Sequence, residues 1–220
     1  MLQDGDGTSV RLITPELEPL QVKMLDNQAQ LRPTGMDNYH ALVARREDDA
    51  RIETAIRYVY MNGKPSGHSP AELTAYKKSD LEIIPLPLPR EHRRYLSGTQ
   101  IAFEVRYHGW SLNQVEVVLT TSNGSMISAM TDLAGQVRFQ LPDDFRDVQA
   151  GRQNNDAAEL VLQVDYDDKG KGHTTRLSMP YYVNPAHWQS NRLAMAMAAG
   201  GFITGIGLMG YSRRRQNNKE

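Results

Sequence analysis

The chain of 220 residues contains no cysteine, and its 25 basic and 26 acidic side chains leave a formal net charge of only −1. Without cysteine there is neither a disulfide framework nor thiolate chemistry, which suits a bacterial periplasm better than a small eukaryotic extracellular domain. The lack of excess positive charge argues against a nucleic-acid binder held by bulk charge. A mean hydropathy of −0.56 excludes a polytopic membrane protein.

A secretory signal peptide is also missing from the visible start of the chain. The first ten residues, MLQDGDGTSV, are polar and acidic and contain no apolar stretch. Three alternatives follow: a signal was removed, the start of the gene is shortened, or the protein is tail-anchored with its main domain in the cytoplasm. The charges around the apolar segment described next favour the first two.

One long apolar run is present near the C-terminus. Residues 193–212 read LAMAMAAGGFITGIGLMGYS and contain no charge. A helix of that length covers a hydrocarbon core of about 30 Å. The alternative is a buried glycine-rich core helix, but such helices rarely lack every charge and end in three arginines. We therefore predict one transmembrane helix at 193–212.

The segments flanking this run predict its orientation. Residues 186–192 are a short juxtamembrane linker, and residues 213–220 form a basic tail. The candidate membrane-interface residues are Trp188, Arg192, Tyr211, Arg213, Arg214 and Arg215. Because most of the positive charge follows the run, the positive-inside rule places the tail in the cytoplasm. The expected location is thus the bacterial inner membrane, in contact with the lipid bilayer, with the bulk of the chain in the periplasm.

Small residues recur at four-residue spacing within the predicted helix. Ala194 and Ala198 form one such pair, and Gly201 and Gly205 form a GxxxG pair. This spacing allows two membrane helices to approach closely. We expect packing against a second copy or another membrane protein subunit. The alternative is that glycine is simply common in membrane helices.

The sequence before the apolar run is typical of β structure. Short segments alternate apolar and polar residues and are separated by turn signals such as Asn123-Gly124. The clearest are IAFEVRY, VEVVLTT, SMISAMT, QVRFQL, AELVLQVDY and HTTRLSMPYYV. Their number and spacing predict a mainly β fold, with an antiparallel, Ig-like or transthyretin-like β-sandwich at residues 86–185.

Residues 1–85 are expected to form a separate, less regular β-rich region. The segment RIETAIRYVYM at 51–61 fits either a helix face or a strand, and its β-branched and aromatic residues favour a strand. SPAELTAY at 69–76 predicts one short helical turn, with Ser69 as N-cap and Pro70 at the first position. Prolines at 85, 87 and 89 suit an edge strand or a linker, so we place the domain boundary there.

No arrangement of residues indicates catalysis. The six histidines show no metal-ligand spacing such as HxxxH, although a site assembled across strands stays open. The loop Gly63–Ser69 has neither the residue order of a P-loop nor that of a nucleophile elbow. We expect a protein that is not an enzyme; an envelope hydrolase is a minor alternative.

Residues 98–142 resemble a pattern of bacterial periplasmic proteins associated with nickel or cobalt uptake, the NikM-like family, long classed as a domain of unknown function. The matching positions are Gly98, Gly109, Leu112, Val115, Val117, Leu119, Thr131, Asp132, Gly135, Phe139, Leu141 and Pro142. Similarity extends over about residues 35–183.

The resemblance implies an accessory or binding component of a membrane complex, with a Ni or Co ion as a candidate cofactor. It maps no metal ligand onto a position of this chain, and the histidine that family members carry near their mature N-terminus is not present. The alternative is a structural subunit that packs through its glycine-rich helix without binding metal.

Overall fold

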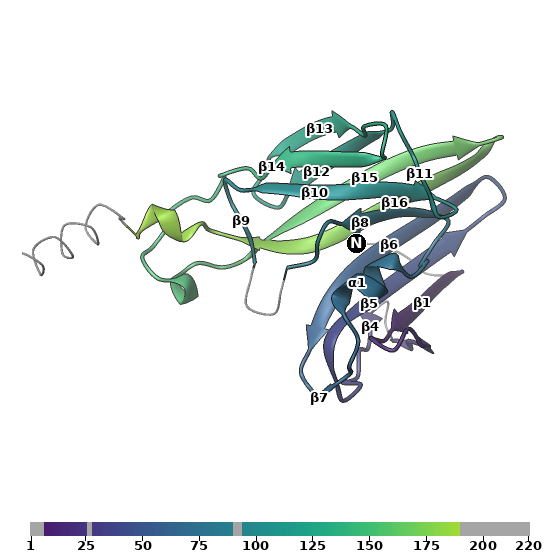
Figure 1. Cartoon of the computed structure of the whole chain (residues 1–220), viewed down its shortest axis with the longest axis horizontal. Helices are drawn as coiled ribbons and strands as arrows, with labels where there is room; N and C mark the ends of the chain where they lie inside the picture. Colours follow the sequence, from purple (N-terminus) through teal and green to yellow (C-terminus); the bar gives the residue numbers. More distant parts are fainter. Residues whose placement is uncertain (1–6, 26–27, 90–93, 190–220) are drawn as a thin grey trace, which may run out of the picture. The chain divides into compact units, whose positions relative to one another are not determined.

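The computed structural model describes residues 7–25, 28–89 and 94–189. Of these, residues up to 146 together with 156–183 form one compact unit, and 147–155 together with 184–189 form a second. The first unit contains every strand and the single α-helix of the described residues. Figure 1 shows the order of these elements along the chain.

The C-terminal half of the first unit is a two-layer β-sandwich. One layer holds β8 (Leu81–Pro85), β10 (Gln100–Tyr107), β11 (Trp110–Ser111) and β14 (Gln136–Gln140), with β10 paired to all three others. The other holds β13 (Met126–Met130), β12 (Glu116–Thr121), β15 (Ala158–Asp168) and β16 (Lys171–Tyr182), in that spatial order. The chain changes layer after β11, β13 and β14. This is the Greek-key arrangement of an Ig-like sandwich, so the predicted fold class is confirmed for this part.

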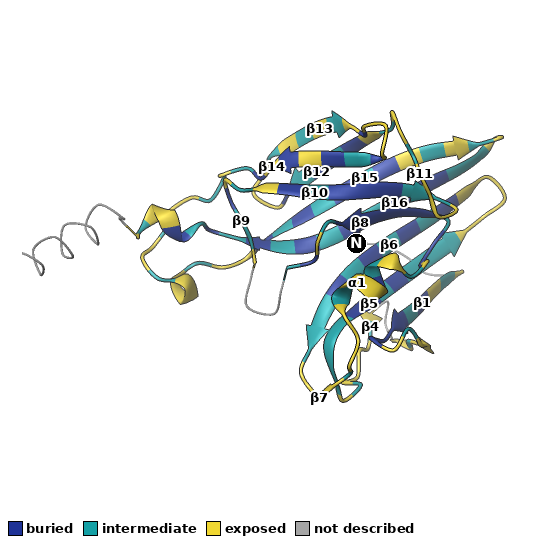
Figure 2. Cartoon of the chain, in the orientation of Figure 1, coloured by how far each residue is buried: buried dark blue, intermediate teal, exposed yellow. Residues whose placement is uncertain are grey.

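Alternating apolar side chains from both layers fill the space between them. Phe103 and Val105 of β10 meet Leu119 of β12, Leu162 of β15 and Leu177 of β16, and all five are fully buried. Figure 2 shows the alternation of buried and exposed positions along β14, whereas β10 is buried or half-buried after its first residue. Burying each of these side chains contributes about 1.5–3 kcal/mol, which makes this layer contact the main stabilising feature of the sandwich.

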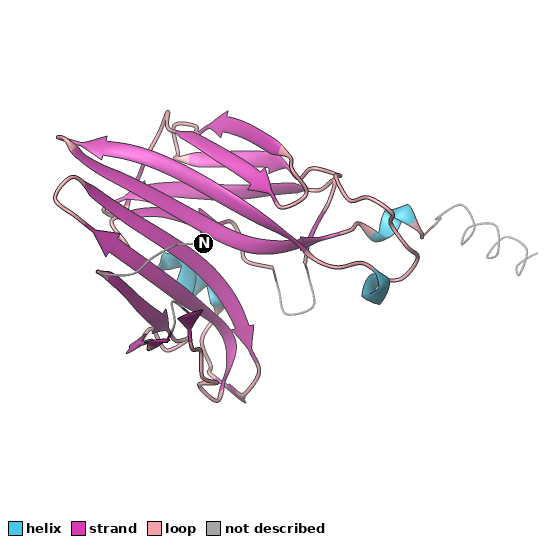
Figure 3. Ribbon diagram, turned by 180° about the vertical axis from the view of Figure 1, so that it is seen from behind, coloured by secondary structure: helices cyan, strands magenta, loops and turns pink. Residues whose placement is uncertain are grey.

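The larger sheet does not end at β16 but continues into the N-terminal part of the chain. Strand β16 pairs in parallel with β6 (Arg51–Met61), and β5 (Met36–Glu47), β1 (Thr8–Ile13) and β2 (Pro19–Gln21) follow in antiparallel order. Figure 3 shows the long β5–β6 and β15–β16 hairpins side by side. The two halves therefore share one sheet.

Three short pairings complete the strands. Strand β7 (Lys64–Pro65) pairs with β5, β9 (Tyr95–Leu96) pairs with β16, and β3 (Met24–Leu25) pairs with β4 (Gln28–Ala29). The first two fasten short segments to strands of the large sheet, whereas β3 and β4 form a separate two-stranded sheet.

The ambiguous segment 51–61 is a strand, as predicted. In β6 every second residue is buried, namely Ile52, Thr54, Ile56 and Tyr58. A helix would have placed Thr54 and Tyr58 on different faces from Ile52 and Ile56, whereas the strand buries all four on one face. The period of two thus decides between the alternatives.

The predicted helical turn is α1 (Pro70–Ala75), and it packs against β5. The Ser69 hydroxyl accepts from the Glu72 N–H at 3.4 Å, and the Glu72 carboxylate accepts from the Ser69 N–H at 3.0 Å. These reciprocal bonds are a capping box, with Pro70 at the first helical position. The helix buries Leu73 in the common core.

The proline-rich segment occupies an edge, as expected, but within the sandwich. Pro85 is the last residue of β8, an edge strand that pairs with β10. At an edge the missing N–H of proline costs no ladder bond. Strand β8 precedes the expected boundary between 1–85 and 86–185, yet it belongs to the same layer as β10, which follows that boundary.

The second unit contains two short 3₁₀ helices, η1 (Arg152–Asn154) and η2 (Pro185–His187). Among the residues that the structure describes, no helix is long and apolar enough to cross a membrane. The predicted span at 193–212 and the tail at 213–220 lie outside the described residues and stay predictions.

Candidate functional site

Four chain segments meet at one end of the sandwich, which we call the loop end: residues 77–80, 107–115, 131–135 and 166–173. The His108 N–H donates to the Asp80 carbonyl at 2.7 Å, and the Gln114 N–H donates to the Thr131 carbonyl at 3.1 Å. The Tyr107 hydroxyl reaches Asp168 at 2.9 Å. Loops clustered at one end of a rigid sandwich are a common place for recognition.

Two large apolar side chains project into solvent at the loop end. Trp110 is 81% exposed in β11, and Leu133 is 86% exposed in the turn between β13 and β14. The two turns touch, because a Cβ on Gly135 would lie 2.9 Å from the Ser111 Cβ. Gly135 also has φ +71°, so glycine is required there on two grounds. Exposed tryptophan is typical of binding surfaces.

The T-D-x-x-G motif noted in the sequence joins these turns. The buried Thr131 hydroxyl donates to the Leu112 carbonyl at 2.8 Å and accepts from the Val115 N–H at 3.0 Å. The Asp132 carboxylate accepts from the Ala134 and Gln136 N–H groups, both at 2.9 Å. The motif is therefore a structural clamp that sets the shape of the loops around Trp110.

Backbone conformations at the loop end are unusual. His108, Gln114 and Lys169 have φ of +50°, +52° and +54° without being glycine. Left-handed conformations of such residues cost about 1–3 kcal/mol each and persist only where the surroundings hold them. The loops thus have a defined shape before any partner binds.

An aromatic cluster stands beside the exposed tryptophan turn. The Tyr107 ring lies 4.2 Å from that of His108, 4.7 Å from Tyr166 and 5.1 Å from His173, measured between centroids. Burial, and then the hydrogen bond that Tyr107 donates to the Asp168 carboxylate, raise the pKa of Tyr107 to about 12. Tyr107 is therefore a neutral hydrogen-bond donor at physiological pH.

His173 is buried in this cluster with its Nδ1 lacking a hydrogen-bond partner. Burial lowers the pKa of His173, outweighing the opposing effect of Asp80. Burial raises the pKa of Asp80, but its ion pairs with Lys77 at 3.0 Å and His108 at 3.2 Å lower it overall. The cluster therefore keeps His173 neutral beside paired surface charges.

The sequence left open a metal site formed by histidines from different strands. In the structure, histidine side chains contact other groups of the protein. Of the histidines outside the loop end, His40 bonds to the Thr34 hydroxyl at 2.7 Å and His68 pairs with Glu72 at 2.7 Å. Within residues 7–25, 28–89 and 94–189, no three or more His, Asp or Glu side chains are grouped so that they could hold a metal ion. The expected Ni or Co ion has no located site.

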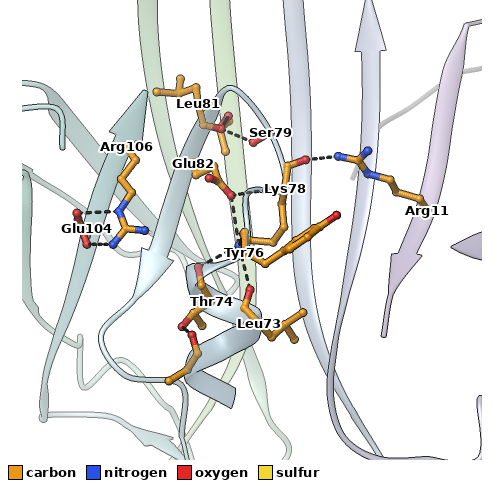
Figure 4. Close-up of polar contacts among 12 residues, drawn as sticks. Arg11, Leu73, Thr74, Tyr76, Lys78, Ser79, Leu81, Glu82, Glu104 and Arg106 are labelled. Carbon is orange, nitrogen blue, oxygen red and sulfur yellow. Dashed lines mark hydrogen bonds and ion pairs between the residues drawn. The ribbon is translucent and has the colours of Figure 1, made fainter. Parts of the chain in front are cut away.

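A second polar cluster is centred on Lys78, which belongs to the 77–80 segment of the loop end but is buried (Figure 4). Lys78 is 1% exposed, and its ammonium donates to the carbonyls of Leu73 at 3.2 Å and Thr74 at 3.1 Å. It also lies 3.3 Å from the Glu82 carboxylate. Arg11 of β1 donates to the Lys78 carbonyl. Because every contact goes to the protein itself, this cluster joins α1, β1 and β8 rather than offering a binding site.

The helix-packing and membrane-interface residues expected from the sequence fall almost entirely outside the described residues. Only Trp188 is described; it is the half-buried C-cap of η2 in the second unit. The remaining ones lie outside and stay predictions: Arg192, Ala194, Ala198, Gly201, Gly205, Tyr211, Arg213, Arg214 and Arg215.

Sequence reasoning missed Trp110 and Leu133 as site residues. Both lie in segments whose sequence indicates turns, HGWSLN and TDLAG, and the two-residue strand β11 that holds Trp110 is exposed. A large apolar residue inside a polar turn was the signal that could have revealed them.

Comparison with known proteins gives distant structural likeness only. No protein-family model and no curated protein matches the sequence, so the resemblance to nickel- and cobalt-uptake proteins is not tested. The chain is similar to the solved structure "D0-D1 domain of Intimin", with a TM-score of 0.31 and 12% identity over 66% of this chain and 62% of that one.

A second similar structure is described as "Ca2+-stabilized adhesin helps an Antarctic bacterium reach out and bind ice". Its TM-score is 0.32 with 13% identity, over 82% of this chain and 41% of that chain. The chain thus spans less than two thirds of either solved structure. The Ig-like assignment rests on the strand order given above.

Proposed function

We propose that this protein is a non-catalytic recognition module that binds another protein subunit of a bacterial envelope complex through its loop end. Trp110 and Leu133 are the anchors of this contact. The predicted C-terminal helix holds the module in the inner membrane. The observation that carries the proposal is the exposure of these two large apolar side chains on touching, pre-shaped turns.

The direction of the strands supports this role. Strand β16 begins at Lys171, in the loop end, and runs to Tyr182 at the opposite end of the sandwich. The chain leaves the sandwich there, toward the predicted span. The loop end and the point where the chain leaves the sandwich therefore lie at opposite ends of the first unit, which leaves the loop end open to a partner's periplasmic domain.

The chemistry of the loop end indicates the kind of partner. Trp110 and Leu133 fit an apolar depression, and burying two such side chains supplies about 1.5–3 kcal/mol each. Next to Trp110, Lys77 and Asp80 form an ion pair at 3.0 Å, and the His108 ring lies 3.2 Å from the Asp80 carboxylate. An apolar centre with a polar rim is the usual design of a protein–protein contact.

The test uses the full chain in its native membrane with a photoreactive amino acid at position 133. We expect one defined crosslinked product, which Trp110→Ala reduces roughly tenfold because a central anchor carries about 1.4 kcal/mol or more. Leu20→Ala is the matched control, since Leu20 is an exposed leucine on another strand and its loss should leave the product unchanged. Products that survive Trp110→Ala, or that Leu20→Ala removes equally, would overturn the proposal.

A more specific expectation is that this protein takes part in nickel or cobalt uptake, and this can be tested separately. It requires the same module to bind Ni²⁺ or Co²⁺, for which the described residues offer no group of ligands. Calorimetric titration of the full chain with each ion decides this independently of the crosslink. The alternative, a structural subunit that packs through its helix, requires that Gly201→Leu or Gly205→Leu releases a co-purifying subunit while the sandwich stays folded.

A further inference from the structure

The larger sheet ends at an edge strand whose backbone is open. Strand β13 pairs with β12 on one side and with no other strand of the described residues. The Thr121 N–H donates to the Ser125 carbonyl, and the Thr131 N–H donates to the Val115 carbonyl, both in the same register. Antiparallel bonding alternates, so Ile127 and Ala129 also face β12. The N–H and C=O groups of Met126, Ser128 and Met130 therefore point outward.

The side chains of these three residues are exposed as well. Met126 is 71% and Met130 is 57% exposed, and Ser128 stands between them. Ile127 and Ala129 point to the other face and pack against the core. The edge thus presents three donor–acceptor pairs together with two flexible apolar side chains.

The order of residues along β13 is symmetric. Read in either direction, MISAM has methionine at both ends, small apolar or β-branched residues next, and serine at the centre. If a second copy pairs antiparallel about Ser128, Met126 faces the other copy's Met130 and Ser128 faces Ser128. A two-fold axis then relates like surfaces, as in most homodimers. Each of the three outward-facing residues exchanges two hydrogen bonds across the axis.

Charge does not oppose this pairing. Residues 117–131, which include β13 and most of β12, contain no Asp, Glu, Lys or Arg. Within each copy, Val118 pairs with Ser128. The four strands that meet at the axis therefore carry, in one row across the sheet, Val118 and Ser128 of one copy followed by Ser128 and Val118 of the other. Natural edge strands usually carry lysine, proline or inward charges that prevent pairing. This edge carries none of them.

The opposite edge of the same sheet does carry such protection. Strand β2 has only three residues, begins with Pro19 and follows Glu18. A short strand that starts with proline lacks an outward donor and pairs poorly. The contrast indicates that the openness of β13 is specific to that edge.

We propose that two copies of this protein join through antiparallel β13–β13 pairing centred on Ser128, forming one continuous sheet. The five-residue contact is small, so it needs the high local concentration that a shared membrane provides. The surface involved does not include Trp110 or Leu133, and the dimer presents two loop ends to a partner.

Cysteine trapping tests the register directly, because the chain has no cysteine of its own. In the two-fold pair the Cα atoms of residue 128 lie about 5.5 Å apart, within the range that a disulfide spans. Full-length Ser128→Cys in membrane vesicles under mild oxidation should form disulfide dimers roughly tenfold more than Gln21→Cys in β2. Met126→Cys alone should not form them, but mixed with Met130→Cys it should.

The outcomes separate the inference from its alternatives. The proposed pairing would be overturned if Ser128→Cys and Gln21→Cys crosslinked equally, or if Met126→Cys crosslinked efficiently alone. Association through the membrane helices alone would not favour one register of β13 against β13. Absence of dimers in every variant would overturn the pairing too. Ser128→Lys, which keeps the strand but introduces facing charges, should lower the dimer fraction; an unchanged fraction counts against the pairing. The Leu133 photocrosslink should survive Ser128→Lys if only the dimer contact is lost.

Discussion

The N-terminal strands continue the larger sheet of the sandwich, but the two regions are stabilised differently. The sandwich buries apolar side chains between two layers, with Phe103 and Leu119 fully enclosed. Apolar side chains of the N-terminal strands, among them Ile13 and Ile56, belong to the same hydrophobic core, and α1, which packs against β5, is fastened by the Lys78 cluster. The N-terminal half thus adds a buried ion pair and hydrogen bonds to the apolar contacts on which the sandwich depends.

Replacing Lys78 should expose this difference most clearly. Lys78→Ala leaves Glu82 buried without its ion-pair partner and removes the donor to the α1 carbonyls. We expect a loss of about 3–5 kcal/mol in the free energy of unfolding. Hydrogen exchange of the full chain should show the loss first in α1 and β5 and later in β15.

The matched control is the double variant Lys78→Met/Glu82→Leu. Apolar residues of similar volume need no ion-pair partner, so part of the lost stability should return, although the buried Lys78 N–H loses its Glu82 acceptor. If Lys78→Ala lowers the exchange protection of β15 as strongly as that of α1, the two halves unfold as one unit. The proposed difference in how they are stabilised is then wrong.

A smaller effect is expected from the helix cap. Ser69→Ala removes the side-chain acceptor of the capping box and should cost about 1 kcal/mol. Because the cap belongs to the N-terminal half, exchange should rise in α1 while β10 and β15 keep their protection. Ser128→Ala, which alters an exposed serine in β13, is the control; a larger effect from that change would contradict the assignment.

Part of the loss of folding stability at low pH should arise in the sandwich. Burial holds the pKa of His173 below 6.5, so between that lowered value and 6.5 the unfolded chain binds a proton that the folded chain refuses. Stability therefore falls as the pH drops through this window. Denaturant titrations at pH 7.5 and 5.5 measure the loss, and His173→Gln should reduce it.

The control for this effect is Leu20→Ala, a change to an exposed side chain that carries no titratable group. That variant should leave the dependence of stability on pH as it is in the unmodified chain. A His173→Gln protein with the same pH dependence as the original would show that His173 is not the group responsible.

Local patterns predicted the secondary structure well. The turn Asn123-Gly124 produces the β12–β13 hairpin, and Ser69 caps α1 as expected. Such features depend on neighbours in the chain, which a sequence displays directly. The parallel pairing of β16 with β6 was not predictable in this way, because it joins Ser178 to Arg57 across more than a hundred residues without a local signal.

By itself, then, the sequence determined that this chain is mainly β, lacks cysteine chemistry, and contains an apolar run suited to a membrane. Period-two alternation and turn residues are properties of short segments, and they act before distant parts meet. Only the tertiary structure decided that both halves share one sheet, that Lys78 is buried, and that Trp110 and Leu133 stand on touching turns. These depend on which surfaces pack together, since burial and exposure are properties of the assembled fold rather than of any segment.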